Sequence, residues 1–116
     1  MSELALHVSV ARFLDAALPK DAFWSTIAHG GFRLPISVAK RLRAMGLKKG
    51  VPDLFVIHNG RAVFLELKVP GNYPTPEQKA VMANIEQAGG FCFVCRSLEE
   101  VADALGQFIP LKLRLT

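Results

Sequence analysis

Three residues near the middle of the sequence combine two carboxylates with an amine: Asp53, Glu66 and Lys68. Each lies beside apolar residues, where burying a charge is costly unless something compensates for it. A divalent cation would provide that compensation, because carboxylate oxygens are ligands that hard cations prefer. The three residue types therefore suggest metal-assisted chemistry.

A β-hairpin would bring these three residues together. Asn59-Gly60 most readily takes the positive φ values of a type I′ turn, and it separates two apolar runs. Glu66 and Lys68 are two residues apart, so they point to the same face of a strand. Asp53 opens the first strand, and an antiparallel hairpin brings that start beside the end of the second. We therefore predict that the three residues gather at one end of a sheet.

Simpler interpretations of these residues also exist. Asp53 follows Pro52 and could serve only as a turn residue. Glu66 and Lys68 could form an ordinary ion pair on an exposed strand, although their apolar neighbours argue against exposure.

The hydrophobic pattern predicts an α/β fold that would position this cluster. Expected helices cover residues 2–18, 35–45, 75–87 and 97–108, and expected strands cover residues 22–28, 54–57, 62–67 and 91–95. The order α-β-α-ββ-α-β-α indicates a mixed sheet flanked by helices. Residues 91–95 are wholly apolar, so burial on both faces is expected, and residues 111–115 alternate like an edge strand.

Gln78 lies at the start of the third predicted helix. Thr75 is a suitable N-cap, Pro76 suits the first helical position, and Gln78 falls where a capping box places Glu or Gln. Capping alone would explain Gln78, although a capping role and a role in a functional site are compatible.

Length and composition favour a single domain over residues 1–116, since 51% of the residues are hydrophobic. No apolar stretch is long enough for a membrane span, and no signal-peptide pattern is present, so a cytoplasmic location is expected. Cys92 and Cys95 would point to opposite faces of a strand and are expected to be core thiols. No metal-ligand spacing of histidines and no Gly-rich phosphate loop occurs, so no nucleotide cofactor is expected.

The formal net charge is +4, and five basic residues are concentrated just before the hairpin. They are Lys40, Arg41, Arg43, Lys48 and Lys49. A basic segment that leads into an acidic site suggests that a DNA backbone is held over a metal. A solvated helix face is the alternative explanation.

Three motifs together resemble the VRR-Nuc domain of the PD-(D/E)xK nuclease superfamily. They are K-x-G-x-P-D over residues 48–53, E-L-K over residues 66–68 and T-P-x-Q over residues 75–78. The resemblance extends from residue 3 to about residue 101, and it is to the short, stand-alone viral or prophage type. It implies a restriction-endonuclease-like core.

Chemistry suggests roles for the central residues. Asp53 and Glu66 supply oxygen ligands suited to Mg²⁺ or Mn²⁺. The metal would polarise the scissile phosphate and lower the pKa of a water. Lys68 would orient or deprotonate that water and stabilise charge on the phosphorane.

The resemblance adds three further residues to this site. It implies a metal contact from the main-chain carbonyl of Leu67 and a contact from Gln78 to water or phosphate. It also implies that Glu3, on the first helix, is an outer acidic group.

These features predict a metal-dependent DNA endonuclease. The resemblance implies branched DNA, such as a Holliday junction, and paired cuts there would require a symmetric homodimer. The alternatives are a simple nicking or restriction-like endonuclease, a nucleic-acid-binding module on the same fold that does not cut, and an interaction domain with a structural ion-pair cluster.

Overall fold

The computed structural model describes residues 1–27 and 34–113, which form four helices and four strands within those ranges. Their bounds are α1 Glu3–Ala17, β1 Phe23–Thr26, α2 Ile36–Ala44, β2 Leu54–His58, β3 Arg61–Leu67, α3 Pro76–Gln87, β4 Phe91–Cys95 and α4 Leu98–Gly106. The predicted order of elements and the mixed sheet flanked by helices are confirmed. The strand predicted to reach residue 28 ends at Thr26, and residue 28 lies outside the described ranges.

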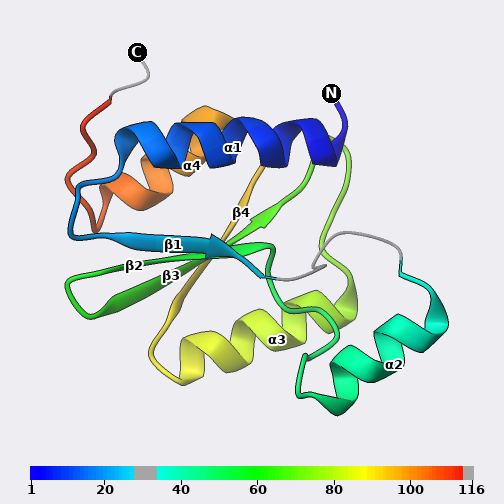
Figure 1. The fold of residues 1–116 in the computed structure, drawn as a ribbon. Helices are drawn as coiled ribbons and strands as arrows, with labels where there is room; N and C mark the ends of the chain where they lie inside the picture. The colour runs from blue at the N-terminus through cyan, green and yellow to red at the C-terminus, as the bar shows by residue number, and fades with distance from the viewer. Residues whose placement is uncertain (28–33, 114–116) are drawn as a thin grey trace.

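The sheet has the strand order β1-β2-β3-β4. β1 pairs antiparallel with β2, β2 pairs antiparallel with β3, and β3 pairs parallel with β4. The parallel step requires a crossover, which α3 supplies between β3 and β4 (Figure 1). The carboxyl ends of β3 and β4 therefore lie at the same edge of the sheet.

The turn between β2 and β3 follows the sequence expectation. Asn59 has φ 52° and Gly60 has φ 76°, so both central residues take the positive φ of a type I′ turn. The register pairs His58 with Arg61 and, at the other end, Leu54 with Leu65. Asp53, directly before β2, therefore lies next to the last residues of β3.

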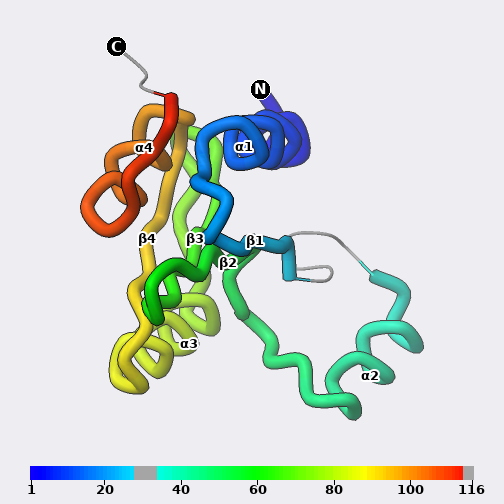
Figure 2. The backbone as a smooth tube through the Cα atoms, turned by 60° about the vertical axis from the view of Figure 1, so that its left-hand side comes forward, coloured from blue at the N-terminus to red at the C-terminus, as the bar shows by residue number. Residues whose placement is uncertain are grey.

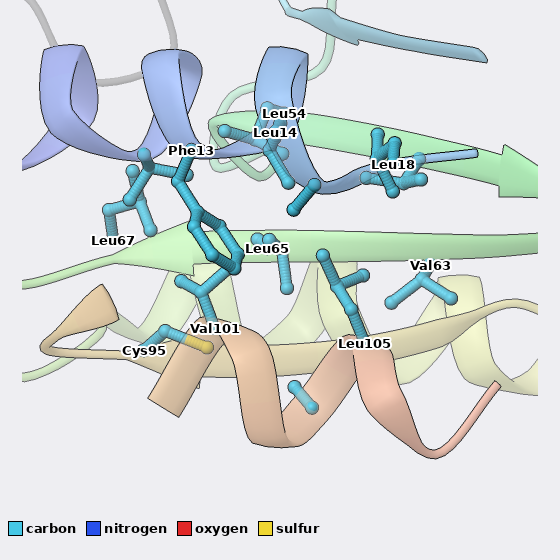
Figure 3. Close-up of a cluster of buried hydrophobic side chains, with 14 of the residues drawn as sticks. Phe13, Leu14, Leu18, Leu54, Val63, Leu65, Leu67, Cys95, Val101 and Leu105 are labelled. Atoms are coloured by element: carbon cyan, nitrogen blue, oxygen red, sulfur yellow. The ribbon is translucent and has the colours of Figure 1, made fainter. Parts of the chain in front are cut away.

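The main core lies between one face of the sheet and the helices α1 and α4, and α3 covers part of the opposite face (Figures 1 and 2). Side chains from α1, β2, β3 and α4 interlock in this core (Figure 3). Leu14, Leu54, Leu65 and Leu105 are fully buried there. Their burial gives the hairpin a rigid support on the face that carries no functional side chain.

Expectations for β4 and for the end of the chain need correction. In β4 only Cys95 is buried, and the other four residues are half-buried because β4 is the last strand of the sheet and has a neighbouring strand on one side only. The two thiols do lie on opposite faces, as predicted: Cys95 packs in the main core, whereas the Cys92 thiol donates to the Met82 carbonyl of α3, with Sγ and O 3.7 Å apart. Burial raises the pKa of Cys92 to about 11 and that of Cys95 to about 12, which leaves both thiols unreactive at neutral pH.

The segment predicted as an edge strand is not a strand over residues 111–113, and residues 114–116 lie outside the described ranges. The backbone N–H of Lys112 instead donates to the carbonyl of Ala17 at the end of α1, with N and O 2.7 Å apart. Lys112 therefore contacts the end of α1 through its backbone rather than pairing with a strand.

The helix α2 stands apart from the sheet in both views (Figures 1 and 2), and none of its residues is buried. Its apolar residues Ile36 and the following C-cap Met45 are 74% and 76% exposed. Within the described ranges, no helix is long and apolar enough to cross a membrane.

Candidate active site

Asp53 is fixed through both its side chain and its main chain. It is 5% exposed, and its Oδ2 accepts a hydrogen bond from the backbone N–H of Leu67, with N and O 2.7 Å apart. Its main-chain carbonyl accepts from the Thr26 hydroxyl at 3.0 Å and from the backbone N–H of Ile27 at 2.8 Å. From the residues described, Asp53 Oδ1 accepts no hydrogen bond. Oδ2 of Asp53 is therefore held by the protein, and Oδ1 is available to a ligand.

Glu66 repeats this arrangement on the neighbouring strand. Its side chain is 3% exposed, and its Oε2 accepts a hydrogen bond from Gln78 Nε2 at 2.8 Å. The Lys68 Nζ lies 3.4 Å from the same oxygen and is itself largely buried, with a side chain 11% exposed. Glu66 Oε1 is buried and has no hydrogen-bond partner among the described residues. Such an orphaned acceptor is costly unless something else binds it.

Burial and mutual repulsion raise the pKa values of both carboxyl groups. Burial and the nearby charge of Asp53 together raise the pKa of Glu66 to about 7, against the attraction of Lys68. Burial also raises the pKa of Asp53, and the hydrogen bond from Leu67 opposes that rise. One ammonium group thus faces two acidic groups, so the site favours additional positive charge.

Gln78 caps α3 and also contacts Glu66. Its Oε1 accepts from the backbone N–H of Thr75 at 2.8 Å, and its backbone N–H donates to the Thr75 hydroxyl at 3.2 Å, which completes the predicted capping box. Its Nε2 is then directed to Glu66. The cap fixes the side chain, and the fixed side chain orients the carboxylate.

Glu3 lies near the cluster, on the first turn of α1. Its charge raises the pKa values of both Asp53 and Glu66, although it contacts neither of them in the described hydrogen bonds. Its Oε2 instead accepts from Asn72 Nδ2 at 3.1 Å, in the loop that follows β3. Figure 1 shows this loop passing beside the start of α1. Glu3 is thus an outer acidic group by position.

The basic residues predicted to bind DNA divide into two groups, and all five are exposed. Lys40, Arg41 and Arg43 lie on α2, away from the sheet. Lys48 and Lys49 lie between α2 and the site, and Lys49 Nζ is 3.9 Å from a carboxylate oxygen of Glu77. The second group therefore adjoins the start of α3, the helix that carries Gln78.

Comparison with known proteins places this geometry in a family. The model of the VRR-NUC domain matches residues 6–99. The chain belongs to the VRR-NUC family. The resemblance inferred from the motifs is thereby confirmed, and with it a place among nucleases of the PD-(D/E)xK type.

Two solved structures share the fold of this VRR-NUC chain. One is described as a VRR_NUC domain protein, with 22% sequence identity and a TM-score of 0.71, covering 94% of this chain and 88% of that one. The other is described as a VRR_NUC domain, with 21% identity and a TM-score of 0.57, covering 91% of this chain and 95% of that one. No curated protein matches the chain.

The VRR-NUC site fits a divalent cation by the chemistry of its donors. Two carboxylates each present one oxygen without a protein donor, and one of these oxygens is buried. Nuclease families of the PD-(D/E)xK type are generally metal-dependent. Among the described residues, no group of three or more His, Cys, Asp or Glu side chains gathers around a point. That small acidic set suits Mg²⁺, which is commonly bound through one or two carboxylates and otherwise keeps water or phosphate oxygens.

Several residues that shape this VRR-NUC site escaped the sequence analysis. Thr26 holds the Asp53 carbonyl, and His7 Nε2 lies 3.1 Å from the Thr26 hydroxyl. Asn72 binds Glu3, as described above. These contacts join α1, β1 and the loop after β3, so only the fold reveals them. His7 and Glu3 do share a face of α1, which was the one local signal.

Gly50, the glycine of the K-x-G-x-P-D motif, lies close to the start of α3. It has φ +92°, and a Cβ placed there would lie 2.7 Å from the Glu77 carbonyl carbon and oxygen and 2.9 Å from the Gln78 nitrogen. The glycine of K-x-G-x-P-D is therefore required where the chain passes the start of α3.

Proposed function

We propose that this chain is a metal-dependent DNA endonuclease that hydrolyses phosphodiester bonds at the Asp53–Glu66–Lys68 cluster. The observation that carries the proposal is the pairing of two buried carboxylates, each with one oxygen held by the protein and one without a protein donor. Membership of a nuclease family supports the same conclusion.

In this proposal Asp53 and Glu66 would hold Mg²⁺ or Mn²⁺, together with the carbonyl of Leu67. The ion, when bound, supplies Lewis-acid polarisation of the phosphodiester. Gln78 keeps the Glu66 carboxylate in one orientation through the 2.8 Å hydrogen bond. Glu3 adds negative charge at the edge of the site and so favours cation binding.

Lys68 acts on the nucleophile and on the developing charge. Its ammonium group lies beside Glu66 Oε2 in a largely buried position, which is where an attacking water and the scissile phosphate would meet the protein. A buried cation stabilises negative charge on the phosphorane more effectively than an exposed one. We assign Lys68 the orientation of the water and the stabilisation of the transition state.

The test is cleavage of labelled four-way junction, flap, single-stranded and linear duplex DNA with Mg²⁺, Mn²⁺ or EDTA. We expect metal-dependent cutting that Lys68→Ala reduces by about 100-fold or more, since loss of one general acid–base or charge-stabilising group costs about that much. Lys20→Ala, an exposed lysine before β1, is the matched control and should cut like the wild type. Unchanged cutting by Lys68→Ala would refute the assignment, and binding without cutting would indicate a non-cutting module.

We further propose that the enzyme resolves branched DNA as a homodimer. An apolar patch formed by Phe23, Phe55 and Ile57 offers an interface. Phe23 is 62% exposed and Ile57 is 41% exposed, and the Phe23 and Phe55 ring centroids are 6.0 Å apart. The register pairs Phe23 with Ile57, so these side chains share the face of the sheet that α3 leaves partly open.

This proposal is tested by measuring the mass of the protein in solution by light scattering, together with the cutting pattern on a junction. The wild type should be a dimer that makes symmetric paired cuts. Phe23→Asp should give a monomer, because a buried unpaired charge opposes association. A monomeric wild type that makes single cuts would favour the nicking-endonuclease alternative.

A further inference from the structure

Tyr73, the only tyrosine of the chain, presents its ring to solvent beside the proposed active site. The residue is 74% exposed, yet its ring is not free, because the Arg96 guanidinium carbon lies 5.2 Å from the ring centroid. A cation at this distance attracts the face of an aromatic ring. The ring is therefore oriented even though most of it is open.

The loop that carries Tyr73 is fixed at three points, all of them through Asn72. The Asn72 backbone N–H donates to the Val69 carbonyl at 3.1 Å, and its side chain donates to Glu3 at 3.1 Å. Arg96 Nη2 donates to the Asn72 carbonyl at 2.9 Å. One arginine thus holds both the backbone before the ring and the ring itself. Such preorganisation lowers the entropy cost of binding a ligand on the ring.

Both residues of this pair lie on segments that connect to the proposed catalytic residues. The loop begins after Lys68 and ends at Thr75, the N-cap of the helix that carries Gln78. The backbone N–H of Lys68 donates to the Cys95 carbonyl at 3.1 Å, and Arg96 follows Cys95. The Tyr73–Arg96 pair therefore lies at the edge of the sheet where the phosphodiester would be cut.

An exposed aromatic ring backed by arginine, next to the proposed site of phosphodiester cleavage, has the chemistry of a stacking platform for a nucleobase. Stacking on aromatic rings and arginine is how proteins bind bases of single-stranded nucleic acids without reading their sequence. A base within a paired duplex is already stacked on both sides, so only an unpaired base has a free face to offer.

We propose that Tyr73, oriented by Arg96, stacks on an unpaired nucleobase beside the scissile phosphate and gives the enzyme its preference for DNA with locally unpaired nucleotides. This inference rests on the proposed nuclease function. It adds to that function a residue that would determine specificity for unpaired nucleotides.

The experiment compares binding to two DNAs, a fully paired duplex and the same duplex with a short central stretch of unpaired nucleotides. One nucleotide of the unpaired stretch is replaced by the fluorescent base 2-aminopurine. Binding is measured in EDTA, so the result is independent of cutting. Wild type and Tyr73→Phe should quench 2-aminopurine and prefer the DNA with unpaired nucleotides. Tyr73→Ala should lose the quenching and bind that DNA about 5- to 100-fold more weakly, while its affinity for the fully paired duplex changes by less than about twofold.

The proposal is overturned if the wild type fails to quench 2-aminopurine, or if Tyr73→Ala weakens binding to both DNAs equally. Because Tyr73 is exposed, circular dichroism of Tyr73→Ala should match that of the wild type, and Tyr73→Phe shows whether the ring alone suffices. Failure of the nuclease proposal would appear as absent cutting with preserved quenching. Failure of the stacking proposal would appear as preserved cutting without quenching.

Discussion

At the scale of single residues, the site contains carboxylate oxygens that accept protein hydrogen bonds and carboxylate oxygens that accept none from the described residues. One carboxylate oxygen of Asp53 accepts a hydrogen bond from Leu67, and one of Glu66 accepts a hydrogen bond from Gln78. Burial makes this arrangement costly for a protein without metal, as the raised pKa of Glu66 shows. We interpret the cluster as a place where stability is given up for the proposed cation binding, which is common at functional sites.

Two substitutions at the start of α3 separate helix capping from the proposed catalytic role of Gln78. Thr75→Ala removes the hydroxyl that caps α3 and should lower stability by about 1 kcal/mol. Gln78→Ala removes the capping box and also the hydrogen bond to Glu66. We expect cleavage to fall substantially for Gln78→Ala and only slightly for Thr75→Ala, when both are measured well below their unfolding temperatures. Equal losses in the two variants would mean that Gln78 serves only the helix.

Glu66 predicts an unusual dependence of stability on pH in the absence of metal. Its folded-state pKa of about 7 lies above its ordinary value of 4.5, so between these values the folded protein binds more protons than the unfolded chain. The free energy of unfolding therefore falls as pH rises from about 4.5 to about 7, and this contribution stays lost above that range. Glu66→Gln, which keeps the shape and an oxygen acceptor, should show a shallower fall.

Urea unfolding in EDTA at several pH values from 4.5 to 8 measures this effect. The difference in stability between the wild type and Glu66→Gln should shift in favour of the variant as pH rises. If the two proteins follow parallel curves, the Glu66 carboxyl does not titrate abnormally and the buried-cluster argument fails.

At the scale of elements, the hairpin and α3 must meet closely for the site to exist. Gly50 makes this possible, because any side chain there would collide with the backbone of Glu77 and Gln78. Gly50→Ala should cost roughly 2 to 5 kcal/mol, since a strained positive φ and an overpacked contact add together. It should also reduce cleavage, because the start of α3 must move and carries Gln78 with it.

Gly46→Ala is the matched control for Gly50→Ala. Gly46 also has a positive φ of +112°, but a Cβ there would meet nothing within 4 Å. Thermal unfolding should therefore show a smaller loss for Gly46→Ala, and cleavage should be preserved. Equal losses of stability would indicate that backbone strain alone, rather than contact with α3, explains the glycine.

The sequence predicted those parts of the fold that depend on local chemistry. The Asn59-Gly60 turn, the capping box at Thr75 and Gln78, and the convergence of Asp53 with β3 follow from turn geometry, capping and strand alternation. These rules act over a few residues, so one sequence is enough to apply them.

Other features depend on which surfaces meet, and periodicity does not report that. The apolar run of β4 indicated burial on both faces, but β4 is an edge strand and four of its five residues are only half-buried. The alternation of residues 111–115 resembled a strand, yet within the described residues Lys112 bonds to the carbonyl of Ala17 at the end of α1. The contacts of Thr26, Asn72 and Arg96 join residues far apart in the chain, and no local pattern marks them.

At the scale of the whole molecule, charge is distributed unevenly around the sheet. The exposed residues Lys40, Arg41 and Arg43 lie on a helix that buries none of its residues. Because no side chain of α2 is buried, its basic side chains are open to a polyanion. We interpret α2 as a contact to the DNA backbone outside the active site.

This interpretation predicts how DNA affinity depends on salt. Each phosphate contact contributes about 0.9 to the slope of log affinity against log salt concentration for duplex DNA. The triple variant Lys40→Gln, Arg41→Gln, Arg43→Gln should therefore bind more weakly and lower the magnitude of that slope by about 1 to 3. The control variant neutralises Lys20, Arg61 and Lys112, which are also exposed but do not lie on α2. It removes the same charge, so it should leave the slope nearly unchanged. Equal reductions in the two variants would mean that net charge, rather than a contact through α2, governs DNA binding.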